Sequence, residues 1–136
     1  MHIDFLSRVF KEFESSVSII WKDKEYGYKH LTENINKNLL LVESHQIKKG
    51  TVVAVEGDFS PNSIALLLSL IEKACIVVPI NNGTNFSRKK LYKISQVEHV
   101  FSISNNDKIT STKISDQSNN ELYKIIRSRR NPGLVF

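Results

Sequence analysis

The chain carries few residues that could do chemistry, and their spacing builds no familiar site. Its four histidines are scattered, and no cluster of His, Cys and Asp stands at metal-ligand spacing: His2, His30, His45 and His99. A structural zinc site needs four such ligands close together, so the sequence predicts no metal site. We expect each histidine at the surface or at a strand end, and Cys75 as a small buried hydrophobic residue.

One turn has the right place for a ligand but the wrong charge. The polar turn Glu56-Gly57-Asp58 is expected to follow a strand, and Ser60-Pro61 is expected to start a helix, with Ser at the N-cap and Pro at the first helical position. Ligands of α/β proteins bind at such strand ends, where the helix N-terminus favours an anion. Two carboxylates oppose an anion there. A phospho-acceptor site would need more acids and a lysine from a later strand.

The glycine patterns of known catalytic loops are absent. The five glycines lie in separate turns, so neither G-x-G-x-x-G nor G-x-x-x-x-G-K-[ST] can be drawn through them, and G-x-S-x-G is also missing. These absences argue against a self-contained dinucleotide site, a P-loop and a nucleophile elbow. The sequence therefore predicts no catalytic, cofactor-binding or metal-binding residue in this chain.

The composition is typical of one globular domain over residues 1–136, with 40% hydrophobic and 24% charged residues. No apolar run reaches the roughly 18 residues of a membrane span, and the start lacks the pattern of a secretory signal. One cysteine fits a reducing compartment, so we expect a cytoplasmic protein. The net charge of +5 gathers at Arg88-Lys89-Lys90 and at Arg127, Arg129 and Arg130. Without aromatic or Gly-rich recognition patterns, these clusters indicate solvated helix faces rather than a nucleic-acid partner.

Residues 51–81 form the unit around which the rest is expected to be built. Two β-branched runs, Thr51–Val55 and Ile76–Val78, flank a helix that starts at Ser60-Pro61 and is apolar almost all round. Pro79 is expected to stop the second strand. Continuous apolar strands joined by a helix predict a parallel βαβ unit whose sheet is covered on both faces.

The segment before this unit is expected to hold two helices and a hairpin. The predicted elements are a helix Asp4–Phe13 capped by Asp4, strands Val17–Trp21 and Glu25–Tyr28, and a helix Lys29–His45. The residues expected on the inner face of the second helix are Leu31, Ile35, Leu39 and Val42, with Asn34 off that face.

The segment after the unit continues the alternation. The predicted elements are a polar loop Asn82–Asn85, a helix Ser87–Gln96, a parallel strand His99–Ile103, an edge strand Lys108–Ile114 within a polar excursion, and a helix Glu121–Arg129. The residues expected to face inward are Leu91, Ile94 and Val97, then Leu122, Ile125 and Ile126. This order predicts an α/β fold: a doubly wound, mostly parallel sheet flanked by helices, with a small N-terminal β-hairpin.

The last residues, Leu134-Val135-Phe136, are apolar and follow a turn. Because termini are usually polar and loosely held, we expect them to open another strand of a larger protein. A C-terminal edge strand that closes a small domain is the alternative.

Several short motifs occur in the order found in one large superfamily. They are Tyr26-Gly27-Tyr28-Lys29-His30-Leu31, then Lys49–Val55, then Pro61-Asn62-Ser63 to Ala74, then Val77–Asn81, followed by the helix and strand over Ser87–Ile103. From about Val17 to Phe136 the chain resembles the N-terminal domain of AMP-forming acyl-adenylating ligases, which include acyl-CoA synthetases, peptide-synthetase adenylation domains and luciferases. It departs from the family pattern at His30, Ala74 and Asn81, where Glu, Gly and Asp are usual.

The resemblance implies a parent enzyme that activates a carboxylic acid with ATP and Mg²⁺ to an acyl-adenylate. The acyl group then passes to a thiol of CoA or an acyl carrier protein. In the family the phosphate-binding loop follows a strand like Gly133–Phe136, so the resemblance implies a fragment that is inactive alone. A complete, non-catalytic α/β binding or interaction module is the alternative, and the reading frame after Phe136 separates the two.

Overall fold

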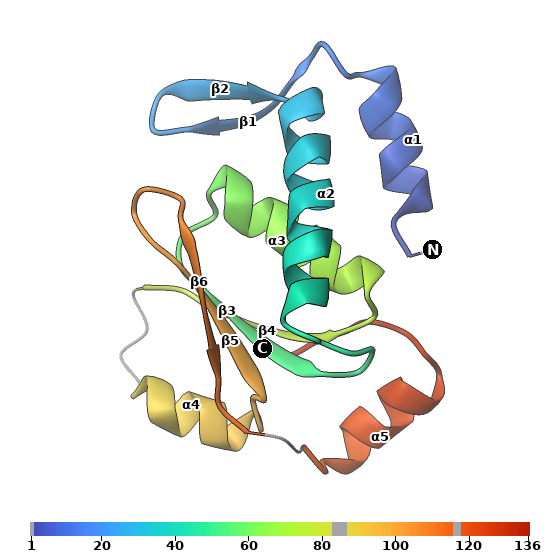
Figure 1. Ribbon diagram of the computed structural model, residues 1–136, viewed down its shortest axis with the longest axis vertical. Coiled ribbons are helices and arrows are strands. Elements are labelled where there is room, and N and C mark those ends of the chain that lie inside the picture. Colours follow the sequence, from blue (N-terminus) through green and yellow to red (C-terminus); the bar gives the residue numbers. More distant parts are fainter. Residues whose placement is uncertain (1, 83–86, 116–117) are drawn as a thin grey trace.

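A computed structural model describes residues 2–82, 87–115 and 118–136. Figure 1 shows a sheet between two layers of helices, with a hairpin and a further helix outside one layer. The strands of this sheet, in the spatial order β6-β5-β3-β4-β7, are β3 (Val52–Glu56), β4 (Ile76–Ile80), β5 (His99–Ile103), β6 (Ile109–Lys113) and β7 (Gly133–Leu134). Only β6 runs antiparallel to its neighbour among these pairings. The predicted doubly wound, mostly parallel α/β sheet is confirmed.

Strand β3 lies at the centre of the sheet, and all five of its residues are buried. Helices α2 (Tyr28–Ser44) and α3 (Pro61–Glu72) cover one face, while α4 (Arg88–Ile94) and α5 (Glu121–Ser128) cover the other (Figure 1). Val53 and Val55 pack towards α2 and α3, and Val52 and Ala54 pack towards α4 and α5. Burial on both faces is why the sequence of this strand is continuously apolar.

The N-terminal helix and the hairpin form an outer layer against α2. Helix α1 (Asp4–Glu12) precedes strands β1 (Val17–Trp21) and β2 (Lys24–Gly27), which pair antiparallel. The hairpin turn is closed by Lys22 and Asp23, both with positive φ of 50° and 60°. A two-residue turn needs this left-handed geometry even where, as here, no glycine supplies it.

Three local predictions are wrong. Glu56 is the last residue of β3 rather than part of a turn, because its carboxylate finds donors inside the protein. Pro79 lies within β4, which continues to Ile80. The strand tolerates it because its missing N–H would face β7, and the pairing with β7 ends at Val77–Leu134. The N-cap of α1 is Ile3, and Asp4 is the first helical residue.

The inward faces of three helices also differ from the prediction. Asn34 of α2 is buried, where its side-chain amide bonds His30 Nε2 at 2.9 Å. Ile94 of α4 and Leu122 of α5 are each 67% exposed, and Ile125 is 47% exposed. Tyr123 is the buried residue of α5, and its hydroxyl donates to the Ser95 carbonyl at 2.8 Å. An aromatic ring with a satisfied polar tip fills this site better than a leucine. Residues 83–85 of the predicted polar loop lie outside the described residues.

Candidate functional site

The carboxyl edge of the sheet is the candidate ligand-binding edge. From β3 the chain passes through α3 to β4 on one side, then returns through α4 on the opposite face to β5 on the other side of β3 (Figure 1). Open α/β sheets bind ligands where the winding direction reverses in this way, outside the carboxyl ends of the strands. Here that point lies between Glu56 of β3 and Ile103 of β5.

A buried carboxylate occupies this point. Glu56 is 4% exposed and accepts hydrogen bonds from the Tyr92 hydroxyl and from the Ser102 hydroxyl at 3.0 Å. Arg88 Nη1 lies 3.4 Å from Glu56 Oε2, with about half of the arginine side chain exposed. Desolvation, together with the hydrogen bond to Glu56, raises the pKa of Tyr92 to about 12. Glu56 therefore joins α4 to the sheet and holds Arg88 at the rim.

The N-terminus of α3 is also occupied by a group of this chain. Ser60 is the N-cap, as predicted, and its hydroxyl accepts from Ser63 N at 3.3 Å. The Asp107 carboxylate accepts from the Ser60 hydroxyl and from Asn62 N at 3.1 and 3.2 Å. A helix N-terminus attracts an anion, and here Asp107 is that anion. The sequence did not point to Asp107, because it belongs to a later segment of the chain.

A small cavity lies beside these groups, between the carboxyl ends of β3 and β4 and helix α3. It measures about 180 Å³ and is lined mainly by apolar side chains, among them Val55, Phe59, Leu67, Pro79 and Ile80. Small-molecule pockets usually measure about 300–1,000 Å³. The cavity is therefore too small to hold a nucleotide by itself, and it could receive only a short apolar group.

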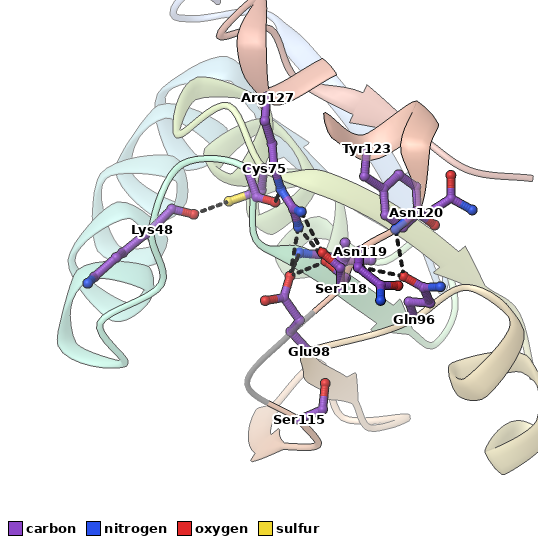
Figure 2. Close-up of polar contacts among 12 residues, drawn as sticks. Lys48, Cys75, Gln96, Glu98, Ser115, Ser118, Asn119, Asn120, Tyr123 and Arg127 are labelled. Carbon is purple, nitrogen blue, oxygen red and sulfur yellow. Dashed lines mark hydrogen bonds and ion pairs between the residues drawn. The ribbon is translucent and has the colours of Figure 1, made fainter. Parts of the chain in front are cut away.

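The amino edge carries a second polar cluster, shown in Figure 2. Glu98 Oε2 accepts from Val52 N at 2.7 Å, from Ser118 Oγ at 3.0 Å and from Arg127 Nη2 at 3.2 Å. Arg127 also donates to the carbonyls of Gly50 at 2.8 Å and Ser118 at 2.7 Å. Arg127 therefore fixes α5 to the sheet, and the prediction of a solvated helix face is wrong for this residue.

The cysteine and the possible metal-ligating side chains form no further candidate site in the described residues. Cys75 is fully buried, as expected, and burial raises its thiol pKa to about 12, which disfavours the reactive thiolate at neutral pH. No three metal-ligating side chains meet anywhere in the described ranges. Within the same ranges every buried side-chain nitrogen and oxygen has a hydrogen-bond partner, so no orphaned polar atom marks a ligand position.

Two of the four histidines, His45 and His99, are far apart in the sequence but lie close together in the fold. The rings of His45 and His99 lie 5.4 Å apart, and both contact the Ser111 hydroxyl. His99 stands at a strand end, as expected, but is only 7% exposed. Periodicity could not have paired them, because α2 and β5 meet only through the sheet order.

The fold of this chain is similar to that of several solved structures, which include the N-terminal subdomain of NpsA. Among the matching solved structures is the NpsA N-terminal subdomain of Klebsiella oxytoca in complex with 3-hydroxybenzoyl-AMSN, with a TM-score of 0.67 and 20% identity over 73% of this chain and 25% of that chain. The artificially fused adenylation–PCP di-domain NpsA-ThdA from the same organism matches with a TM-score of 0.69 and 18% identity over 96% of this chain and 24% of that chain. VinN in complex with L-aspartate matches with a TM-score of 0.69 and 14% identity over 79% of this chain and 30% of that chain.

These likenesses show the fold, including the order of elements that the motif resemblance implied. The chain spans about a quarter to a third of the length of these three structures. No protein-family profile and no curated protein sequence matches the chain. No helix in the described parts of the chain is long and apolar enough to cross a membrane.

Proposed function

We propose that this chain is the N-terminal part of an adenylate-forming ligase. Such an enzyme joins a carboxylic acid to the α-phosphorus of ATP, which releases pyrophosphate and leaves an acyl-adenylate. A thiol then displaces AMP and takes the acyl group as a thioester. The observation that carries the proposal is the match to the NpsA-ThdA di-domain over 96% of this chain with a TM-score of 0.69.

The thiol we propose belongs to CoA or to a carrier protein. The adenylation–PCP fusion among the similar structures supports a carrier protein. We further propose a cytoplasmic location, which the buried, reduced Cys75 supports. ATP and Mg²⁺ are proposed for the whole enzyme, since charge in phosphoryl-group chemistry is stabilised by cations and positioned donors.

Among the described residues, the carboxyl edge offers the cation Arg88, which is paired with Glu56, while Glu56 and Asp107 are internally bonded. We therefore propose that the 136-residue chain has no adenylating activity alone. Titration of Mg·ATP into the chain by calorimetry is expected to show no binding, and acid-dependent pyrophosphate exchange is expected to be absent. Micromolar ATP affinity would contradict this prediction.

The ligase proposal is tested on the transcript that encodes the chain. A frame that continues after codon 136 into a Ser/Thr/Gly-rich segment supports it, and the product of that frame should exchange pyrophosphate with one member of a carboxylic-acid panel. A stop codon directly after Phe136 would favour the α/β binding module instead.

A further inference from the structure

The net positive charge of the chain is concentrated on one face of the sheet. Residues 87–98 and 118–136, which contain α4 and α5, hold eight cationic side chains and two acidic ones. This excess of six is larger than the formal net charge of +5 of the whole chain, so the remaining residues together carry a slight negative charge. Both helices cover the same face of the sheet (Figure 1). We call the exposed side of these residues the α4–α5 face.

Most of these cations are not used inside the protein. Three of them, Arg88, Lys124 and Arg127, have an acidic partner within the chain. The others are exposed and have no hydrogen-bond or ion-pair partner in the part of the chain that the structure describes: Lys89, Lys90, Lys93, Arg129 and Arg130. The α4–α5 face therefore attracts anionic groups from solution.

The same face exposes aliphatic side chains. Ile94 and Leu122 are each 67% exposed, and Ile125 is 47% exposed. The Tyr123 hydroxyl donates to the Ser95 carbonyl at 2.8 Å, which places α5 beside the end of α4. Ile94 and Leu122 adjoin these two residues in the chain, so exposed aliphatic side chains flank the junction of the two helices. A helix face that contacts only water usually carries polar and charged residues instead.

A groove with a mainly apolar lining runs beside α4. It measures about 560 Å³ and is bounded by Lys89 and Lys93 of α4, by Val97 after that helix and by Ile114 after β6. The two lysines stand one helical turn apart, and both are exposed. An apolar groove with cations along one side fits a helix that carries acidic and aliphatic side chains at the same spacing.

We propose that the α4–α5 face binds an acidic amphipathic helix of a partner protein. Carboxylates of that helix pair with Lys89 and Lys93, and its aliphatic side chains enter the groove beside α4. A lipid surface is a poorer fit because the apolar part of this face is a groove. Nucleic acid is disfavoured because the exposed apolar residues are aliphatic and offer no ring on which a base stacks. The inference does not depend on the ligase proposal, since it concerns a helical face rather than the carboxyl edge of the sheet.

The test titrates the 136-residue chain into a fluorescent helical peptide that carries Glu and Leu at alternate helical turns, with anisotropy as the readout. Saturable binding with a Kd of roughly 1–100 μM is expected at physiological salt, and it should weaken as salt is added. A peptide with Gln for every Glu and one with Ala for every Leu should each bind at least roughly tenfold more weakly. No saturation by roughly 1 mM chain would overturn the proposal. Equal binding of the Ala peptide would do so too, because charge alone would then explain the affinity.

Two double variants of equal charge locate the site. Lys89→Gln with Lys93→Gln is expected to raise the Kd roughly three- to tenfold, as the loss of two exposed charge contacts does. Lys29→Gln with Lys37→Gln is the matched control on α2, where both lysines are exposed on the other side of the sheet, and it should leave the Kd unchanged. An equal loss in both would overturn the proposal, because it indicates attraction by overall charge. Tighter binding of phosphatidylserine vesicles or duplex DNA than of the peptide would also overturn it and identify a lipid or nucleic-acid partner.

Discussion

Cys75 shows how one residue combines packing with chemistry. It is fully buried where β4 begins, and its thiol donates to the Lys48 carbonyl with 3.8 Å between sulfur and oxygen. Its pKa of about 12 lies above the ordinary value of 9. Because the unfolded chain loses the thiol proton first, this group adds stability that is complete below pH 9 and is lost as the pH rises towards 12.

We therefore predict that native Cys75 resists alkylation at pH 8 and reacts promptly once the chain is unfolded. Mass spectrometry after a timed iodoacetamide pulse, with and without urea, measures this. The free energy of unfolding should also fall between pH 9 and pH 12, with Tyr92 adding to the decline because its pKa is raised as well. Rapid alkylation in buffer without urea would refute the assignment.

At the residue scale, the sequence predicts those features that depend only on residues nearby in the chain. The Ser60-Pro61 helix start and the buried Cys75 follow from local rules. The polar run Glu56-Gly57-Asp58 predicts a turn after the apolar strand, yet Glu56 is the last residue of β3. Its donors Tyr92 and Ser102 come from later elements, and nothing in the local pattern indicates them.

At the scale of elements, the N-terminus of α3 depends on a residue from another segment. Asp107 adopts a positive φ of 61° and completes the cap that Ser60 begins. Replacing it by glycine keeps this backbone geometry and removes only the carboxylate. We predict that Asp107→Gly lowers the free energy of unfolding by about 1–2 kcal/mol, the usual value of a cap and its charge.

Urea denaturation followed by circular dichroism measures this loss. Asp23→Gly is the matched control, because Asp23 also has a positive φ of 60° but is exposed in the β1–β2 turn. That variant should stay within about 0.5 kcal/mol of the parent. Equal losses in both variants would show that glycine itself, rather than the missing cap, destabilises the chain.

The helices also show where periodicity is insufficient. Both ends of the long α2 and the start of the apolar α3 agree with the prediction to within one residue, since their patterns run over several turns. Helices α4 and α5 are short, so a pattern of three apolar residues fits more than one face. In α5 the buried residue is Tyr123 rather than Leu122. The Tyr123 ring packs in the core beside residues of β4, and its hydroxyl donates to the Ser95 carbonyl.

At the scale of the whole molecule, Arg127 joins α5 to the residues that precede β3 and β5. Its guanidinium group donates to Gly50, Glu98 and Ser118, which belong to three separate segments of the chain. Lysine keeps the charge but cannot make the forked contacts. We predict that Arg127→Lys costs about 1–3 kcal/mol of unfolding free energy and speeds amide exchange in α5.

Hydrogen exchange read by mass spectrometry resolves this effect by segment. Arg129→Lys, an exposed position two residues further along, is the control and should match the parent protein. A loss of protection in the α2–α3 layer that equals the loss in α5 would contradict a local role for Arg127.

The sheet order also has a consequence for self-association. Val135 N donates to Val77 O at 2.9 Å, and the next rung on that side of β4 would need an N–H from residue 79, which is a proline. The part of β4 that β7 leaves uncovered therefore offers a second molecule no donor. Open edges are where sheets of different molecules join into aggregates. A proline within a buried strand thus limits intermolecular pairing at the edge beside it.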